Sequence, residues 1–125
     1  MRTRKFRGKA VTGENHWVFG SLVQSDNKAW IVPTWAGIGG AAVEVDPETV
    51  GQFTGMLDGP QNEVCEGDII GEDGEVLGIV CYDDSRAAFV IESPEGKHVE
   101  YLSDFGSGAG DWKIIGNIHE KSTAQ

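Results

Sequence analysis

Six carboxylates gather in one short stretch of the chain, and their type and density come nearest to a chemical site. They lie between residues 63 and 75: Glu63, Glu66, Asp68, Glu72, Asp73 and Glu75. Such density would suit calcium or magnesium, but the D-x-[DN]-x-[DN]-G spacing of an EF-hand loop is missing. No spacing selects two of them as a glycosidase pair. They serve either as solvated turn residues or as an acidic docking face for a basic partner.

Other groups that could do chemistry are sparse. The three histidines are far apart in the chain and form no HxH, HExxH or Cys/His pattern, so a zinc site is not supported. Cys65 and Cys81 lack CxxC spacing and are expected to be free, buried thiols. No nucleophile–base pair or phosphate-binding loop is recognisable. We therefore expect a protein without enzymatic activity, metal or cofactor.

The four tryptophans divide into two pairs. Trp17 and Trp30 fall in adjacent predicted strands, where they are expected to fill the core. Trp35 follows Pro33-Thr34 in a loop-like stretch, and Trp112 follows a glycine-rich loop at residues 106–110. Trp35 and Trp112 are therefore the better candidates for an interface or for stacking on a ligand.

The charge of the chain is unusual and segregated. Its 125 residues include 20 acidic and 10 basic side chains, a formal net charge of −10. Five of the basic residues lie within the first nine positions, and residues 29–85 contain no lysine or arginine. Such a field repels nucleic acid and attracts basic partners, so nucleic acid is disfavoured except through the N-terminal basic arm. Solubility alone would also account for the acidity.

The hydrophobic pattern predicts a mostly β protein. Short apolar segments rich in Val, Ile, Trp and Phe alternate with Gly, Asn, Asp or Pro. The predicted strands are 16–23, 29–32, 42–45, 68–71, 75–83, 87–92, 97–101 and 112–118. Tight turns are expected at residues 25–28, 72–74 and 93–96. Asp46 and Pro47 predict the start of one short helix that runs to Phe53.

These elements define the expected architecture. The block from Glu66 to Phe105 reads as a small SH3-like, partly open barrel, to which extra N-terminal strands and the short helix are added. One domain is expected over residues 1–125, with loosely ordered ends at 1–8 and 120–125. No apolar run is long enough for a membrane span, and no apolar segment of a secretory signal follows the basic N-terminus. The expected location is therefore the cytoplasm.

Three segments resemble the YopX family of phage and prophage proteins. The first joins Lys5-Phe6-Arg7-Gly8-Lys9 to Trp17-Val18-Phe19-Gly20-Ser21-Leu22, and the second runs from Val45-Asp46-Pro47-Glu48-Thr49 through Asp58 to Glu66-Gly67-Asp68-Ile69. The third is Ile114-Ile115-Gly116-Asn117-Ile118-His119-Glu120. The resemblance implies a phage or prophage origin, a location in the bacterial host cytoplasm, and homo-oligomers. It carries over no catalytic or binding residue.

Two functions remain open at this point. The leading one is a non-catalytic accessory protein that self-associates and binds a host or phage macromolecule, such as a basic protein, through its acidic face. Counter-defence by blocking a basic host surface is one form of it. The alternative is a protein that sequesters a small ligand or nucleotide at a subunit interface, with Trp35 and Trp112 stacking on the base.

Overall fold

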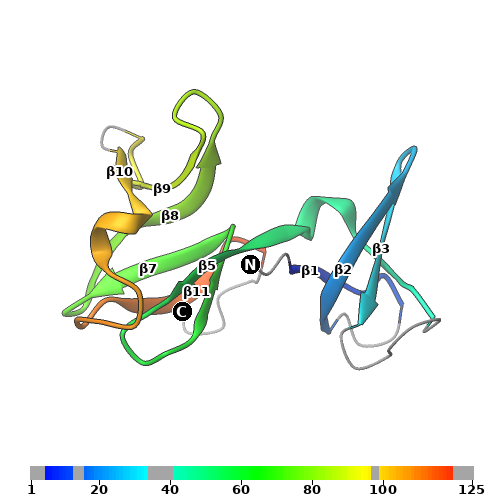
Figure 1. Cartoon of the computed structure of the whole chain (residues 1–125), viewed down its shortest axis with the longest axis horizontal. Coiled ribbons are helices and arrows are strands. Elements are labelled where there is room, and N and C mark those ends of the chain that lie inside the picture. The colour runs from blue at the N-terminus through cyan, green and yellow to red at the C-terminus, as the bar shows by residue number, and fades with distance from the viewer. Residues whose placement is uncertain (1–4, 13–15, 34–40, 97–98, 120–125) are drawn as a thin grey trace. The chain divides into compact units, whose positions relative to one another are not determined.

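The chain divides into two compact units, Met1–Phe53 and Thr54–Gln125. The computed structural model describes residues 5–12, 16–33, 41–96 and 99–119. Almost all regular structure is antiparallel β, as the sequence predicts, and the strands form two sheets (Figure 1). No helix within those residues is long and apolar enough to cross a membrane. That residues 1–125 act as one domain stays a prediction.

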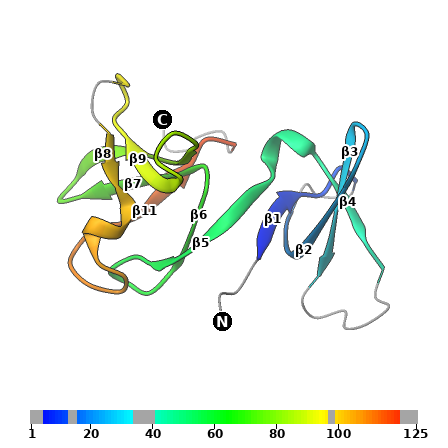
Figure 2. The same ribbon diagram turned by 45° about the horizontal axis from the view of Figure 1, so that its top comes forward.

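The first unit is built around a long hairpin. Strand β2 (Trp17–Ser25) pairs with β3 (Lys28–Pro33) across a turn at Asp26-Asn27, where the sequence predicts one. Strand β1 (Phe6–Lys9) pairs with the other side of β2, and β4 (Val43–Val45) pairs with β3. The order of strands in this unit is therefore β4-β3-β2-β1, and the beginning of β5 (Gly51–Leu57) lies next to β1 (Figure 2).

One face of this first sheet carries the core of the unit. The alternation of side chains along each strand sends one set to the core and the other set to the opposite face. The buried core residues are Ala10, Val18, Ala29, Ile31 and Val45. Gly20 also lies on this face, where an added Cβ would come within 1.9 Å of the carbonyl oxygen of Val32. A glycine is therefore needed for β2 and β3 to approach so closely.

Two sequence expectations are wrong in the first unit. The predicted loose end at residues 1–8 includes Phe6–Gly8, which belong to β1, hydrogen-bonded on both of its edges. The predicted helix is one turn of 3-10 helix, η2 (Pro47–Thr49), after which the chain continues as β5. Asp46 caps the turn as expected, since its side chain accepts a hydrogen bond from the backbone N–H of Glu48. The turn does not grow because Gly51 pairs with Arg7 of β1.

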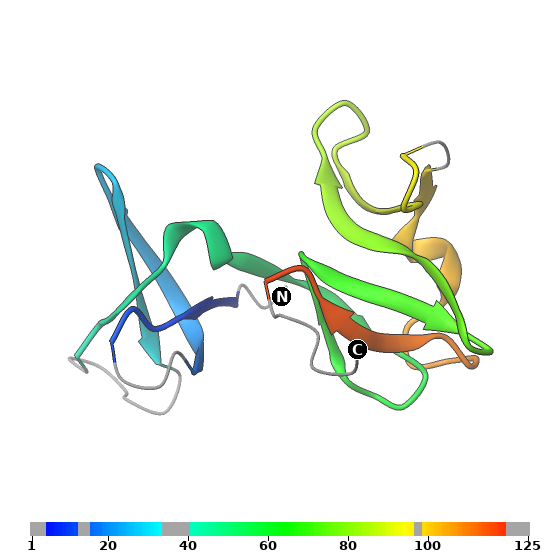
Figure 3. The same cartoon turned by 180° about the vertical axis from the view of Figure 1, so that it is seen from behind.

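The second unit holds a five-stranded antiparallel sheet. Its strands are β7 (Asp68–Glu72), β8 (Glu75–Asp83), β9 (Ala88–Glu92), β10 (Val99–Tyr101) and β11 (Lys113–Asn117). The order is β10-β9-β8-β7-β11, so the last strand returns to lie beside the first one of the meander (Figure 3). A 3-10 turn, η3 (Leu102–Phe105), precedes this return. The rest of β5 and the short β6 (Glu63–Cys65) complete the unit.

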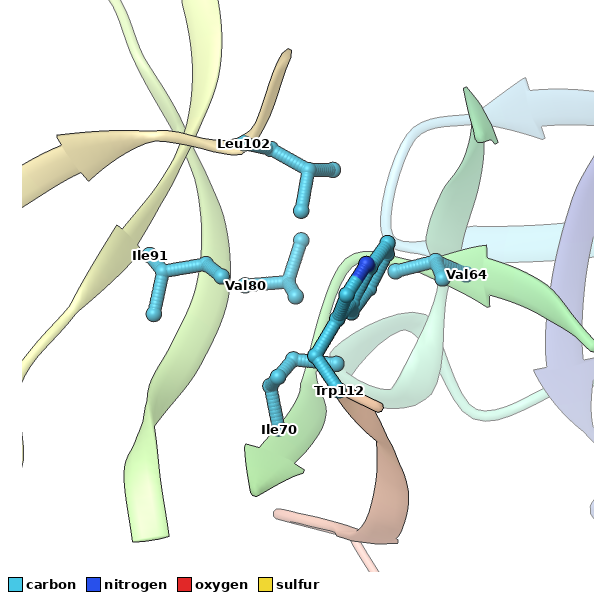
Figure 4. Packing of buried hydrophobic residues seen from close by; sticks show 6 residues of the cluster. All are labelled: Val64, Ile70, Val80, Ile91, Leu102 and Trp112. Carbon is cyan, nitrogen blue, oxygen red and sulfur yellow. The ribbon is translucent and has the colours of Figure 1, made fainter. Parts of the chain in front are cut away.

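The sheet of the second unit is open, with β10 and β11 at its two edges. The mostly β prediction is confirmed, and the SH3-like barrel stays a prediction. The core of the unit combines residues from several of these elements: Val64, Ile70, Val80, Ile91, Leu102 and Trp112. Figure 4 shows the indole of Trp112 among Val64, Ile70 and Val80. Burial of these apolar side chains supplies the main stabilisation of the unit.

Candidate binding surfaces

The six carboxylates singled out in the sequence do not form one cluster. Glu63 lies on β6 and is exposed, and Glu66 is partly exposed in the turn before β7. Asp68 is buried at the start of β7. Glu72, Asp73 and Glu75 lie together at the hairpin between β7 and β8. The sequence grouped residues that the fold assigns to different tasks.

The hairpin residues Glu72, Asp73 and Glu75 form what we call the acidic tip. Asp73 and Gly74 make the two-residue turn, and both have left-handed backbones, with φ of 52° and 82°. This geometry is that of the type I′ turn, which matches the twist of a hairpin. Glu72 and Glu75 are paired directly across the two strands. The like charges of Glu72 and Glu75 repel each other, which destabilises the hairpin. A cation bound at the tip would reduce this repulsion.

Asp68 has a different task, which removes it from the predicted acidic face. It is 1% exposed, and its Oδ2 accepts a hydrogen bond from the backbone N–H of Cys65 at 2.8 Å. Gly67, between them, has a left-handed φ of 91°, which a glycine adopts without strain. The carboxylate of Asp68 therefore holds the turn between β6 and β7. Glu-Gly-Asp is a folding device at this place.

The prediction that Trp112 offers an exposed surface for stacking is wrong. Trp112 is 2% exposed and belongs to the core of the second unit. Its Nε1 donates a hydrogen bond to the carbonyl oxygen of Gly106 at 3.2 Å, and its ring meets that of Phe105 edge to face, with centroids 5.6 Å apart. The glycine-rich loop before it folds back over the indole. Trp35, the other residue of the pair, lies outside the described residues.

The glycine-rich loop is also held to a second loop. The N–H of Gly108 donates to the carbonyl oxygen of Leu57 at 2.7 Å, and the Oγ of Ser107 accepts from the N–H of Leu57 at 2.8 Å. Gln61 donates from Nε2 to the carbonyl oxygen of Gly108 at 2.9 Å. These three hydrogen bonds fix the loop in place, so it is a packed connection and no lid over a ligand.

The two other tryptophans are not core residues, although the sequence predicts that they are. Trp17 and Trp30 are half-buried and lie outside the core cluster of the first unit. The strand registers place them on the face of the first sheet opposite to that core. The sequence does contain a signal for this placement. Trp17 is adjacent to Val18 and Trp30 is adjacent to Ile31, and neighbouring residues of a strand point to opposite faces of the sheet.

Cys81 lies on the face of the second sheet that points away from the core, and it is partly exposed. Burial raises the pKa of its thiol, and the negative charges of Glu92, Asp83 and Glu66 raise it further.

The expectation of a buried free thiol is confirmed for Cys65 and is wrong for Cys81. The three carboxylates show that negative potential surrounds this face. Its apolar members include Ile79 and Tyr101, of which Tyr101 is 43% exposed.

Asp83 anchors the loop that follows β8. Its Oδ1 accepts hydrogen bonds from the N–H and the hydroxyl of Ser85, at 2.9 and 2.7 Å, and its Oδ2 is paired with Arg86. The hydrogen bond from Ser85 and then the one from Arg86 hold the pKa of Asp83 below its usual range. Asp83 therefore stays ionised at neutral pH, and the positive charge of Arg86 partly neutralises it.

A buried carboxylate that sequence reasoning assigned no role is Asp58, which is 0% exposed. It lies in the loop after β5, and its oxygens accept hydrogen bonds from the N–H of Asn62 at 2.6 Å and the N–H of Ile114 at 3.0 Å. Over the described residues, no group of three or more His, Cys, Asp and Glu side chains could hold a metal ion. Asp58, like Asp68, satisfies backbone donors.

The comparison with protein families gives one match, to the model described as YopX protein, and it covers residues 5–124. The chain belongs to the YopX family. Curated proteins give no match. In this YopX chain three acidic residues of the family-like segments, Asp46, Asp58 and Asp68, accept hydrogen bonds from backbone N–H groups of turns and loops. The resemblance therefore reports on the fold, and the surfaces must be judged by their own chemistry.

Proposed function

We propose that this YopX chain is a non-catalytic accessory protein that binds a basic macromolecule through its second unit. Residues 54–125 contain 15 acidic and four basic side chains, whereas residues 1–53 contain five acidic and six basic ones. The attraction for a cationic surface therefore originates in the second unit. A phage or prophage origin, and counter-defence by covering a basic host surface, are the finer parts of this proposal.

The observation that carries the proposal is the acidic tip. Three carboxylates occur within four residues, and two of them face each other across the hairpin. The repulsion between Glu72 and Glu75 costs about 0.2–1 kcal/mol in the free protein. A lysine or arginine of a partner placed between them would remove this cost and add its own attraction. This gain in binding free energy arises only where the two glutamates face each other. It therefore distinguishes the tip from the other acidic side chains of the unit.

The test compares two double variants with the same change in charge. E72Q/E75Q removes two of the three charges of the tip, and E95Q/D104N removes two exposed carboxylates elsewhere in the second unit. The probe is a short fluorescent peptide rich in lysine and arginine, followed by fluorescence anisotropy. We expect the tip variant to weaken binding about tenfold and the control about twofold, on the scale of a charge-assisted hydrogen bond. Equal losses in both variants would refute the tip as the site.

Self-association belongs to the same proposal. β10 forms an end of its sheet order, and such an edge strand presents backbone groups that can pair with another chain. Native mass spectrometry of the purified protein measures the number of subunits and any retained ligand together. A monomer at micromolar concentration would contradict self-association and leave the peptide test unaffected.

The alternative function is the binding of a nucleotide stacked on Trp35 and Trp112. Trp112 is buried in the core, so its ring is not accessible for such stacking. No observation favours that particular site over the acidic tip. A stacking surface of different composition is a separate matter, and it lies on the first unit.

A further inference from the structure

The face of the first sheet opposite to its core combines cations with aromatic rings. On β1 the alternation of side chains sends Phe6 and Gly8 to the core side and Arg7 and Lys9 to the other side. The registers put aromatic residues beside these cations: Lys9 is opposite Trp17, and Arg7 is opposite Phe19. We call this surface the basic aromatic face. Its six defining residues are Lys5, Arg7, Lys9, Trp17, Phe19 and Trp30.

Close contacts between the two kinds of side chain hold the face together. The guanidinium carbon of Arg7 lies 4.6 Å from the centroid of the Trp17 ring, and the Nζ of Lys9 lies 5.6 Å from it. The Nζ of Lys5 lies 5.5 Å from the ring of Phe53, whose N–H donates to the carbonyl oxygen of Lys5. Cation–π contacts of this kind fix the direction of long, flexible side chains. A row of cations along β1 therefore runs beside a row of rings along β2.

The aromatic rings are accessible in part. Phe19 is 39% exposed, and Trp17 and Trp30 are half-buried. Val23, on the same face and opposite Trp30, is 48% exposed. Trp17 and Phe19 are two residues apart on one strand, which separates them by about 7 Å. That distance is enough for each ring to stack on its own base.

The charges on this face are mostly positive, in contrast to the rest of the chain. Besides Lys5 and the two cations of β1, Lys28 lies at the turn end of the face, where it pairs with Ser25. Glu44, opposite Trp30, is the acidic side chain that the registers of β1 to β4 place on the same face within the described residues. The acidic second unit repels polyanions, so a polyanion that does bind is directed to this surface.

We propose that the basic aromatic face binds single-stranded nucleic acid without sequence preference. Phosphates would pair with the amino groups of Lys5, Lys9 and Lys28, while bases stack on the rings of Trp17, Phe19 and Trp30. Arg7 is 7% exposed, so its guanidinium holds the ring of Trp17 in place and does not itself meet the nucleic acid. Single strands fit better than duplexes, because side-chain rings on a sheet can stack only on bases that are not already stacked in a duplex. The inference does not depend on the function proposed for the acidic tip.

The experiment measures the fluorescence anisotropy of a labelled oligothymidylate of about 15 nucleotides, within the site size of one small β domain. F19L keeps an apolar side chain but removes the ring, and we expect it to weaken binding about 5- to 100-fold. V23A on the same face and Y101A on the second unit are the controls, with changes of about twofold or less. Circular dichroism establishes that each variant is folded.

A second measurement isolates the cations. With three phosphate contacts, the logarithm of the association constant should fall with the logarithm of salt concentration with a slope of about −2. K9Q should reduce this slope by about 0.7, and K113Q on β11 should leave it unchanged. Equal binding by F19L and the native protein, equal binding of duplex and single strand, or full displacement by polyglutamate at equal charge would each overturn the proposal.

Discussion

The hydroxyl of Thr49 accepts a hydrogen bond from the backbone N–H of Lys9 at 2.9 Å, across 40 residues of sequence. The same hydroxyl donates to the carbonyl oxygen of Asp46 at 2.6 Å. The Asp46-Pro47-Glu48-Thr49 turn is therefore tied to the end of β1, which carries the cations of the basic aromatic face. A motif that looks like helix capping in the sequence thus also positions a distant strand.

The first prediction concerns this contact. T49V keeps the shape of the side chain but leaves the N–H of Lys9 without its acceptor, so we expect a loss of about 1–3 kcal/mol in the free energy of unfolding. T49S keeps the hydroxyl and should lose less than half as much. Urea unfolding measures both, and hydrogen exchange at the amide of Lys9 should accelerate in T49V alone. Equal stability of T49V and the native protein would contradict the structural role.

The second prediction concerns Asp58. D58N keeps an oxygen for one backbone N–H but turns an NH2 group toward the other, so we expect the second unit to lose about 1.5–3 kcal/mol. D58A leaves both donors without an acceptor and should lose more. D104N, at an exposed carboxylate, is the control with the same charge change. Thermal unfolding followed by circular dichroism checks the order, and a D58N protein as stable as D104N would refute it.

The third prediction tests the close approach of β2 and β3. The methyl group of G20A would overlap the carbonyl of Val32, and backbone atoms cannot move away without breaking the pairing of the strands. We expect a loss of about 2 kcal/mol or more in the free energy of unfolding of the first unit. S21A, at the exposed neighbouring position, should change it by less than about 0.5 kcal/mol. Urea unfolding followed by tryptophan fluorescence compares the two variants.

Turn chemistry made much of the fold predictable from the sequence. Asp26-Asn27, Asp73-Gly74 and the segment Ser93–Gly96 occupy turns where their residue types predict them, and in the last the N–H of Gly96 donates to Ser93. β1 was missed because its sequence offers one large apolar side chain among charged ones. Its order comes from pairing with β2 and with β5, and β5 is more than 40 residues away in the sequence, where local patterns do not report it.

The candidate site was less predictable, because burial depends on the whole fold. Trp112 follows a glycine-rich loop, which is typical of a surface position, but the loop is pinned to Leu57 and Gln61 and covers the ring. Asp68 stands among exposed carboxylates in the sequence, yet its partner, the N–H of Cys65, is inside the unit. The acidic tip, by contrast, follows from the sequence, since a two-residue turn forces its flanking residues to face each other.

The last prediction concerns the thiol of Cys81. Its pKa is raised, first by burial and then by Glu92, Asp83 and Glu66, so at neutral pH less of it is thiolate than in an ordinary cysteine. Its alkylation by iodoacetamide should therefore be slow at neutral pH and accelerate at higher pH than for a free thiol. E92Q removes one of the negative charges, lowers the pKa and should speed alkylation at a given pH by about threefold or less. E95Q is the control of equal charge, and Cys65, which is 1% exposed, should stay unmodified in the folded protein. Identical pH profiles for E92Q and E95Q would contradict a contribution of Glu92 to the raised pKa of Cys81.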